Sequence, residues 1–439
     1  MKDARAKVYD ALVVGGGPSG ASAAIHLATG GARVLLAERA RFPRAKLCGE
    51  FISPECHAHF ERLGVRDAMS ARAGAREVAE TVFYAPSGRS VRVPSEWFGV
   101  ASGARARALG LSRAEMDARL LARAREVGVE VLEDAQAAAV LTDESGAVVG
   151  ARLNAEGGER TCLARVTLDA TGRARAVARL YERESKRRGD EKELRSVGGR
   201  ESERRFVEGR RRLVEARRRR ASLVAFKAHL EGARAEPGAC EIYFYRGGYG
   251  GLSPVEGGAS NLCFITRASD ARASASDPAR LVREILMSNR RAARALADAR
   301  VSSAWLSVAL EGFGRGSPAP VRGLLAVGDA ASFIDPFTGS GMLMAFESGE
   351  LAAHAVLGRL ADVIDDGSAL DALARDYCDS YEARFGARLR LCSTLRRAAF
   401  APPPAIEAGV VALGASGALR RRLARATRGA GLGFFGRPA

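Results

Sequence analysis

The chain opens with apolar runs that are separated by a glycine-rich break. Residues 8–14 are mostly apolar and β-branched, which is typical of a parallel strand buried on both faces. Small apolar residues over 21–30 predict a helix that two glycines end. A second apolar run, 32–38, finishes on Glu38. The pattern therefore predicts a strand, a helix and a second parallel strand within about 30 residues.

The break between the first strand and the helix reads Gly-Gly-Gly-Pro-Ser-Gly, which fits the spacing GxGxxG. Gly15 permits a tight turn, Gly17 lets a diphosphate approach the backbone, and Gly20 lets the helix pack closely on the strand. The free N–H groups at the helix N-terminus favour the phosphates. Glu38, 23 positions after Gly15, is placed to accept hydrogen bonds from an adenosine ribose. We expect an ADP-dinucleotide site made of Gly15, Gly17, Pro18, Ser19, Gly20 and Glu38.

A second glycine-rich segment near the other end of the chain indicates which dinucleotide binds. A short apolar strand over 323–327 leads into Asp329, and a loop leads into a long helix from Gly341. An aspartate at the end of a strand can accept a hydrogen bond from a ribityl hydroxyl, a group that NAD lacks. The following helix N-terminus can stabilise the negative charge of a reduced flavin. The sequence thus predicts FAD, with Gly328 and Asp329 at the ribityl chain and the helix N-terminus at Gly341 beside the flavin.

Five segments together resemble one known family. They are GGGPSG with Glu38-Arg39, FPRAKLCGEFISPE at 42–55, LSRAEMDARL at 111–120, LDATGR at 168–173 and GDAASFIDPFTGSGM at 328–342. With them the chain resembles FAD-dependent oxidoreductases of the geranylgeranyl reductase type, within the p-hydroxybenzoate-hydroxylase-like superfamily. The resemblance spans nearly the whole chain and implies non-covalent FAD.

The resemblance also implies further cofactor contacts. Arg113 would lie on a helix that contacts the FAD phosphates or the ribityl chain. The segment 46–50 would pass beside the flavin ring, where a small Cys-Gly pair permits close approach of the backbone. Asp169 and Gly172 would either end a strand near the cofactor or form a plain turn. Pro336 and Gly339 would border the flavin ring. The other cofactor-binding candidates added by the resemblance are Arg39, Lys46, Cys48, Gly49, Arg113, Asp169 and Gly172.

The middle of the chain is rich in apolar alternation and glycine turns, which predicts strands. They are expected to form a second, mostly antiparallel sheet over the flavin, in which Tyr243, Tyr245 and Tyr249 either line the pocket or pack one face of the sheet. In the reductase family this region carries a YxWxFPK-like motif, whereas residues 249–255 here contain neither the Trp nor the Lys. The predicted strands cover 77–86, 89–97, 222–230, 239–257, 261–267 and 304–310.

These elements predict an α/β fold, in which a Rossmann-like FAD-binding domain carries an inserted, mainly antiparallel substrate domain and C-terminal helices. An Ala/Arg-rich segment interrupts the pattern and is expected to form a solvated helical insertion. The expected boundaries are 1–75, 101–180 and 318–370 for the FAD-binding domain, 76–100 and 222–317 for the substrate domain, 181–221 for the insertion and 371–439 for the C-terminal helices.

The composition and charge of the chain indicate few binding partners. The net charge of +17 would favour nucleic acid only if it gathered on one face, so no specific nucleic-acid binding is expected. No signal peptide or membrane-spanning run is present, which predicts a cytoplasmic protein. Residues 405–434 combine small apolar residues with arginines and predict packed helices. The alternatives left open are contact with the inner face of the membrane or with a carrier protein.

The seven cysteines are scattered and include no CxxC pair, so neither a disulfide framework nor a zinc site is expected. The group formed by Cys48, Cys56, His57 and His59 matches no metal-ligand spacing, and no metal is predicted. No histidine or carboxylate stands out as a catalytic acid or base. The pocket candidates are Cys48 and Tyr249.

The predicted function is that of an FAD-dependent oxidoreductase acting on a lipophilic substrate of isoprenoid, polyketide or lipid type. The resemblance favours reduction of a carbon–carbon double bond. Hydroxylation with NAD(P)H and O2 remains the alternative. Because no second GxGxxG follows a predicted strand, NAD(P)H would donate electrons without a binding domain of its own. Halogenation and electron transfer to a quinone are weaker options, since WxWxIP and a late four-cysteine cluster are missing.

Overall fold

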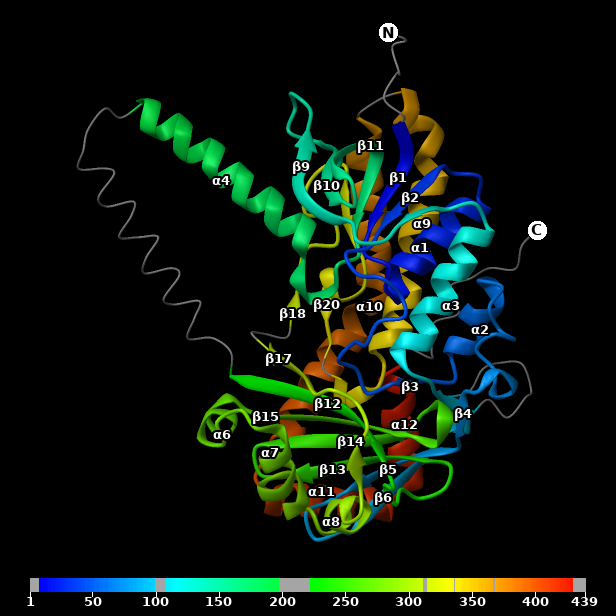
Figure 1. The fold of residues 1–439 in the computed structure, drawn as a ribbon, viewed down its shortest axis with the longest axis vertical. Coiled ribbons are helices and arrows are strands. Elements are labelled where there is room, and N and C mark those ends of the chain that lie inside the picture. The colour runs from blue at the N-terminus through cyan, green and yellow to red at the C-terminus, as the bar shows by residue number, and fades with distance from the viewer. Residues whose placement is uncertain are drawn as a thin grey trace.

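The computed structural model describes residues 8–98, 107–196, 222–310, 314–334, 336–365 and 368–428. Two sheets dominate it, one in the upper part of Figure 1 and one in the lower part, and long helices run alongside both. The predicted α/β architecture with an added, mainly antiparallel sheet is confirmed.

The first sheet has seven strands and is parallel where the predicted strand–helix–strand unit lies. Strand β1 pairs in parallel with β2 and β11, β2 pairs in parallel with β8, and β11 pairs in parallel with β19. The strands β9, β10 and β11 form an antiparallel meander at one edge. The bounds are β1 (Val8–Val14), β2 (Val34–Ala37), β8 (Glu130–Leu132), β9 (Gln136–Thr142), β10 (Val148–Ala155), β11 (Gly158–Asp169) and β19 (Leu324–Ala326).

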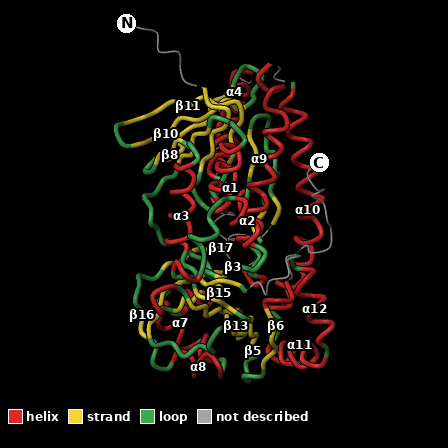
Figure 2. Tube along the Cα trace, turned by 90° about the vertical axis from the view of Figure 1, so that its right-hand side faces the viewer, coloured by secondary structure: helices red, strands yellow, loops and turns green. Residues whose placement is uncertain are grey.

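Helices from both ends of the chain pack together on one face of this sheet. Helix α1 (Pro18–Thr29) lies against α9 (Gly341–Asp365), and α3 (Arg113–Glu126) lies beside α1 (Figures 1 and 2). Two glycines make the turn before α1 possible. Gly15 has a φ of +113°, and a Cβ on Gly20 would stand 1.8 Å from the carbonyl oxygen of Gly15. The apolar contacts between these helices and the sheet form the largest core.

The second sheet has eight strands and is antiparallel except where β13 pairs with β5. Its order is β16-β12-β15-β14-β13-β5-β6, with β17 paired to β12. The bounds are β5 (Glu80–Tyr84), β6 (Ser90–Pro94), β12 (Leu223–Glu231), β13 (Ala239–Tyr245), β14 (Gly248–Pro254), β15 (Ser260–Arg267), β16 (Arg300–Val301) and β17 (Leu306–Leu310).

The strand that the sequence predicts over 77–86 is divided between two sheets. Its first part, β4 (Arg76–Val78), pairs with β7 (Ala108–Gly110), which also pairs with β3 (Phe51–Ile52). Its second part, β5, joins the second sheet. The strands β18 (Gly314–Arg315) and β20 (Ser332–Phe333) pair with each other in a separate two-stranded antiparallel sheet.

The remaining helices include three that the alternation pattern does not predict, α6 (Ala268–Ala273), α7 (Pro278–Glu284) and α8 (Arg290–Leu296). Helix α2 (Cys56–Arg62) lies near α9. Helix α4 (Ala176–Ser196) covers the start of the predicted insertion, and residues 197–221 lie outside the described residues. The helices predicted at the C-terminus are confirmed as α10 (Ala369–Ala399), α11 (Pro403–Ala415) and α12 (Gly417–Ala426), and residues 429–434 lie outside the described residues. Within the described part of the chain, every helix is too short or too polar to cross a bilayer.

Candidate cofactor and substrate site

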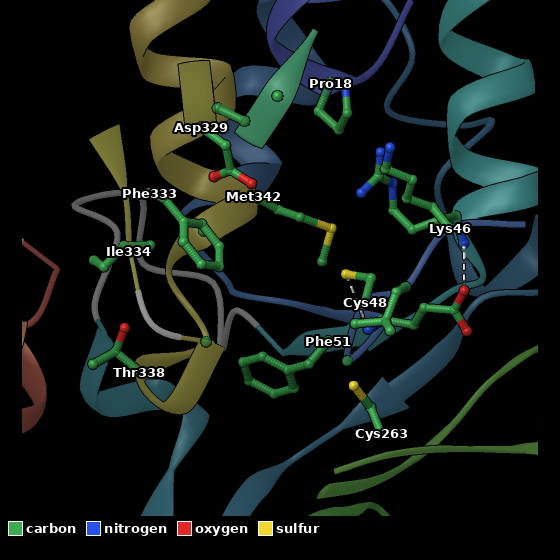
Figure 3. A pocket seen from close by; sticks show the side chains of 18 of the residues that line it. Pro18, Lys46, Cys48, Phe51, Cys263, Asp329, Phe333, Ile334, Thr338 and Met342 are labelled. Atoms are coloured by element: carbon green, nitrogen blue, oxygen red, sulfur yellow. Dashed lines mark hydrogen bonds between the residues drawn. The ribbon is translucent and has the colours of Figure 1, made fainter. Parts of the chain in front are cut away.

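A cavity of about 660 Å³ lies between the two sheets and reaches the C-terminal helices. Figure 3 shows part of it, with Asp329 and Pro18 at one end and Lys46 and Cys48 facing them across the open space. The two ends of the chain therefore converge on one cavity. Of the residues predicted from sequence, its wall contains Gly15, Gly17, Pro18, Ser19, Glu38, Arg39, Lys46, Cys48, Gly49, Arg113, Gly172, Tyr249, Asp329, Gly339 and Gly341.

Four predicted contacts lie outside this wall. Gly20 packs against the backbone of Gly15, and Gly328 lies against Ser19. Asp169 is fully buried, and its carboxylate accepts hydrogen bonds from the backbone and hydroxyl of Thr171 and from the backbone of Ala178. It thus shapes the turn that carries Gly172 to the cavity. Pro336 begins a short helical turn next to the wall. Direct contact between the cofactor and these four residues stays a prediction.

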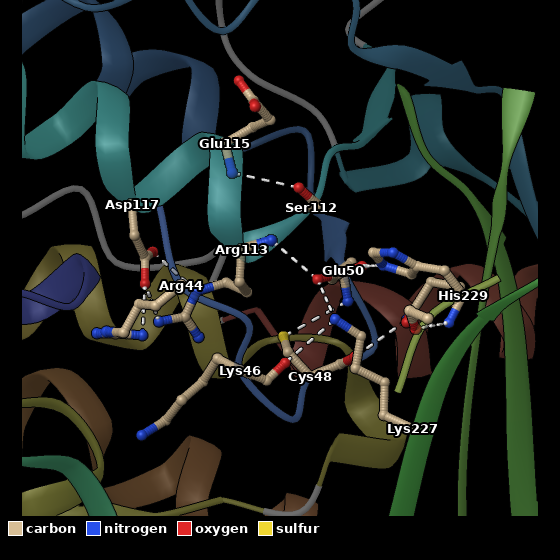
Figure 4. Close-up of polar contacts among 12 residues, drawn as sticks. Arg44, Lys46, Cys48, Glu50, Ser112, Arg113, Glu115, Asp117, Lys227 and His229 are labelled. Carbon is tan, nitrogen blue, oxygen red and sulfur yellow. Dashed lines mark hydrogen bonds and ion pairs between the residues drawn. The ribbon is translucent and has the colours of Figure 1, made fainter. Parts of the chain in front are cut away.

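Two arginines approach the N-terminus of α1, whose first residues Pro18 and Ser19 are buried. Gly17 caps this helix without any side-chain hydrogen bond. A Cβ on Gly17 would lie 3.6 Å from Nη2 of Arg113 and 3.9 Å from Nη2 of Arg44. Asp117 is fully buried; it accepts two hydrogen bonds from Arg113, at 2.8 and 2.7 Å, and lies 3.2 Å from Nη1 of Arg44 (Figure 4). One carboxylate therefore orients two guanidinium groups toward a place suited to a diphosphate.

Glu38 lies at the end of β2, on the cavity wall, and is 6% exposed. Its carboxylate accepts a hydrogen bond from the backbone N–H of Gly16 at 2.8 Å and lies 3.5 Å from Nη2 of Arg44. These contacts fix the acid at the edge of the cavity. The position suits an acceptor for ribose hydroxyls, as the sequence spacing predicts.

The charges along the cavity have shifted pKa values. Burial, together with the nearby Arg44, lowers the pKa of Lys46 to about 8. Burial raises the pKa of Asp329 to about 6, although Arg173 opposes the shift. For Arg113, burial disfavours the charged form, but the Asp117 carboxylate outweighs it and raises the pKa. At neutral pH the wall therefore presents cations beside Gly17 and a carboxylate at Asp329.

The loop 46–50 is fastened to the second sheet by a buried ionic network. Glu50 is fully buried with a φ of +54°. Its carboxylate accepts hydrogen bonds from the backbone of Arg113 at 2.9 Å, from Nζ of Lys227, and from Nε2 of His229 at 2.6 Å (Figure 4). Lys227 also donates to the carbonyl of Lys46 at 3.2 Å. The loop that presents Cys48 and Gly49 to the cavity is therefore held by strand β12.

The far part of the cavity is apolar. Alternate residues of the second sheet face it, and α10 to α12 close it. Tyr249 belongs to this wall, with ring centroids 5.4 Å from Phe337 and 5.9 Å from Phe400. Tyr243 and Tyr245 point into the core on the other face of the sheet, so the prediction that they line the pocket is wrong. The apolar wall includes Phe83, Val91, Val93, Phe98, Ala225, Ile242, Phe244, Ile265, Leu310, Leu395, Val410, Leu413 and Leu423.

Sequence reasoning missed several residues that build the site. Asp117 is one of them, although it follows Arg113 at the i,i+4 spacing of a helical ion pair. Only one feature of the sequence hints at the ion pair between Glu50 and Lys227. It is the single lysine inside the apolar run 222–230. A lysine in a buried strand needs an acidic partner, but the sequence does not say which.

The residues present fit an FAD molecule. Nε of Arg44 is buried and has no hydrogen-bond partner among the described residues. A phosphate of the bound cofactor would satisfy this donor. A Cβ on Gly49 would meet no atom within 4 Å, so the loop leaves open space for a planar ring beside it. The diphosphate end and the carboxylate of Asp329 lie along one continuous cavity, which an extended coenzyme requires.

Comparison with known proteins supports this assignment. The family described as "FAD binding domain" matches residues 8–384, which confirms FAD as the cofactor. Digeranylgeranylglycerophospholipid reductase 2 of Methanopyrus kandleri is 27% identical over 86% of this chain and 83% of its own length. Menaquinone reductase of Mycolicibacterium smegmatis is 28% identical over 88% of this chain and 85% of its own length. The predicted resemblance to the reductase type is confirmed by these relatives.

A solved structure shows the same fold. It is a geranylgeranyl bacteriochlorophyll reductase-like protein from Thermoplasma acidophilum, with a TM-score of 0.71 and 19% identity over 96% of both chains. At this identity the likeness concerns the fold.

Proposed function

The chain belongs to the FAD binding domain family and is an FAD-dependent oxidoreductase, and from that premise we propose that it reduces a carbon–carbon double bond of a lipophilic substrate. The observation that carries the proposal is the apolar part of the cavity, which is continuous with the cofactor end. An apolar chamber of this kind favours a long hydrocarbon substrate over a polar metabolite. Two relatives that match most of the chain are named as reductases, one of a prenylated phospholipid and one of menaquinone.

The residues divide into two tasks. Arg44 and Arg113 would hold the diphosphate, Glu38 the ribose and Asp329 the ribityl chain. Bound FAD supplies the hydride-transfer chemistry. The aromatic contact between Tyr249 and Phe337 would exclude water from the place where the double bond meets the cofactor.

The described wall of the apolar part contains no histidine or carboxylate that could donate a proton. Its uncharged polar groups include the thiol of Cys263 and the hydroxyls of Thr81 and Ser253. Burial raises the pKa of Cys263 to about 12, so the thiol stays protonated at neutral pH. A proton that the substrate carbon requires would therefore come from such a group or from water.

The test begins with electron donation. The purified protein is reduced with NADH or NADPH in the absence of oxygen, and bleaching of the flavin absorbance reports which donor works. The reduced protein is then mixed with geranylgeraniol or menaquinone, also without oxygen. Products are exposed to air before analysis, because reduction of menaquinone to its quinol also adds two hydrogens and is reversed by oxygen. A product that then retains two added hydrogens by mass spectrometry supports the proposal, and flavin that stays reduced with every unsaturated lipid tested would contradict it.

Oxygenation is the second candidate, and one observation favours it. Strand β14 and the residue after it, 249–255, lack the Trp and Lys of the reductase-type motif. The same reduced protein, exposed to ¹⁸O₂ with the substrate, separates the two reactions. Incorporation of labelled oxygen into the product would favour a monooxygenase, whereas unlabelled product with two added hydrogens would favour the reductase.

A further inference from the structure

Helix α12 carries a group of arginines that has no acidic partner among the described residues. We call Arg420, Arg421, Arg422 and Arg425 the α12 arginine group. None of the four forms an ion pair in the part of the chain that the structure describes, whereas many other arginines of the protein pair with Asp or Glu. The carboxylate of Glu407 on the preceding helix accepts from Ser87 instead. The group therefore leaves several positive charges uncompensated.

This group is organised around one aromatic ring. The guanidinium carbons of Arg420 and Arg421 lie 5.7 and 5.3 Å from the ring centroid of Trp97. Arg425 donates a hydrogen bond to the carbonyl of Trp97 at 3.2 Å. Stacking on Trp97 holds the guanidinium groups in place while leaving their N–H donors free for an anion.

Arg420 also reaches the cavity. It lies on the cavity wall, and its Nε is buried with no hydrogen-bond partner among the residues that the structure describes. Leu423, Ala424 and Thr427 line the same wall, so one face of α12 borders the apolar part of the cavity. A buried, unpaired donor of a charged group is costly unless a ligand completes it.

The same helix face leads toward the cofactor end. Arg428 follows the C-terminal end of α12 and also lies on the cavity wall. Its Nη1 donates to the carbonyl of Gly339 at 2.9 Å, and Gly339 is on the wall near the predicted flavin position. A molecule with an anionic end at Arg420 and a hydrocarbon chain along Leu423 and Ala424 would thus point its chain toward the cofactor.

We propose that Arg420, supported by Trp97 and Arg421, is a subsite for the anionic group of an amphiphilic substrate, a phosphate or a carboxylate. The inference rests on the proposed function, since it names the class of lipophilic substrate. It predicts that a neutral quinone or alcohol binds less tightly than a chain of the same length with an anionic end.

The test compares three ligands with the same hydrocarbon chain, farnesyl phosphate, farnesoic acid and farnesol. Calorimetric titration of the full-length, FAD-loaded protein, below the concentration at which each ligand self-associates, gives the dissociation constants. We expect the two anions to bind about tenfold more tightly than farnesol, as one charge-assisted hydrogen-bonded pair would give. Whichever anion binds more tightly identifies the headgroup as phosphate or carboxylate.

Substitutions test whether Arg420 is the residue that causes the preference for an anionic ligand. Arg420→Met should remove most of the preference for an anion and leave farnesol binding unchanged, and Arg420→Lys should keep part of it. Arg300→Met is the matched control, because Arg300 is exposed on β16, on the opposite side from α12 in Figure 2, and should change nothing. Circular dichroism and FAD content verify that each variant is folded.

The outcomes separate this inference from the proposed function. Equal binding of all three ligands to the wild-type protein would overturn the subsite and leave the lipophilic-substrate proposal intact. Binding of none would overturn both. If Arg420→Met and Arg421→Met left anion binding unchanged but weakened sedimentation with anionic phospholipid vesicles, the α12 arginine group would be a membrane contact and the subsite proposal would fall.

Discussion

The cofactor end and the apolar end of the cavity are built in different ways. The cofactor end is made by short segments in which residues close in sequence contact one another. Examples are Gly15 to Gly20 at the start of α1 and the Arg113–Asp117 ion pair within α3. The apolar end is assembled from strands of the second sheet and three C-terminal helices that are far apart in the chain. Local chemistry positions the charges at one end, and tertiary packing shapes the other.

The Glu50 network joins the two ends. Glu50 belongs to the loop at the cofactor end, and its partners Lys227 and His229 lie on the sheet that forms the apolar end. Asn261 of β15 adds a hydrogen bond to the carbonyl of Cys48 at 3.0 Å. A change in the position of the sheet would therefore be passed to the loop beside the predicted flavin. Substitutions that break one end while sparing the other test this division.

Disrupting the Glu50 network that joins the two ends should have the largest effect, which is on the stability of the protein. Glu50→Gln removes the negative charge that compensates Lys227, which is 3% exposed. Leaving a buried ammonium without its counter-ion should lower the free energy of unfolding by about 3–5 kcal/mol. The midpoint of urea unfolding, followed by circular dichroism, measures the loss.

The control for Glu50→Gln is an exposed pair. Glu284 accepts from Arg280 at 2.7 Å on α7, and both side chains are about half exposed. Glu284→Gln should therefore cost less than about 0.5 kcal/mol. Equal losses for the two variants would show that the buried network does not hold the sheet to the loop.

Weakening the cofactor end alone should have the next largest effect. Asp117→Asn removes the carboxylate that orients Arg113 and Arg44. FAD affinity should fall by roughly 10- to 100-fold, the loss expected for charge-assisted hydrogen bonds. Quenching of FAD fluorescence on binding measures the dissociation constant. Glu115→Gln on the same helix is the control, and a similar loss there would point to the stability of α3 instead.

Filling the apolar end should spare the cofactor. Ala424→Trp places a large side chain on the cavity wall, and we expect binding of a lipophilic ligand to weaken by about tenfold. FAD content should stay unchanged, because Ala424 lies in the apolar part. Ala426→Trp is the matched control on the same helix, exposed and outside the cavity wall. Loss of FAD from the Ala424 variant would show that the two ends are not separate.

The same division explains what the sequence could predict. Gly15, Gly17, Gly20 and Glu38 could be assigned because each acts within one strand–helix–strand unit, whose spacing is set by local geometry. The turn at Asp329 could be matched to it because both follow the carboxyl ends of parallel strands in one sheet. Even there, Asp169 supports a turn and not the cavity wall, since the strand end alone does not fix the direction of a side chain.

The apolar end could not be predicted in the same way. Alternation in β13 indicates that Tyr243 and Tyr245 share a face, but only the packing of the sheet decides which face meets the cavity. Lys227 is 177 positions from Glu50 in the sequence, so no short sequence motif could predict that they pair. The arginine at position 420 reaches the cavity only because α12 folds back beside Trp97.

The smallest expected effect concerns pH and again separates the two ends. Lys46 has a pKa of about 8 in the protein without cofactor, lowered by burial and by Arg44. A bound diphosphate would favour the charged lysine and raise that pKa, so FAD binding takes up protons near pH 8. Affinity should then fall as the pH rises, by roughly fourfold between pH 7 and pH 8.5. Asp329, with a pKa of about 6, is ionised across this range and adds little.

The control is Lys46→Met, for which the dependence of FAD affinity on pH should flatten and the loss of affinity relative to the wild-type protein should be smaller at pH 8.5 than at pH 7. The reason is that at pH 8.5 most of the wild-type lysine is already neutral before FAD binds. If the methionine variant kept the same fall between pH 7 and pH 8.5, another group at the cofactor end would be titrating. Binding of a neutral lipophilic ligand to the holoenzyme should not change with pH in either protein, because the apolar wall holds no group expected to ionise in that interval.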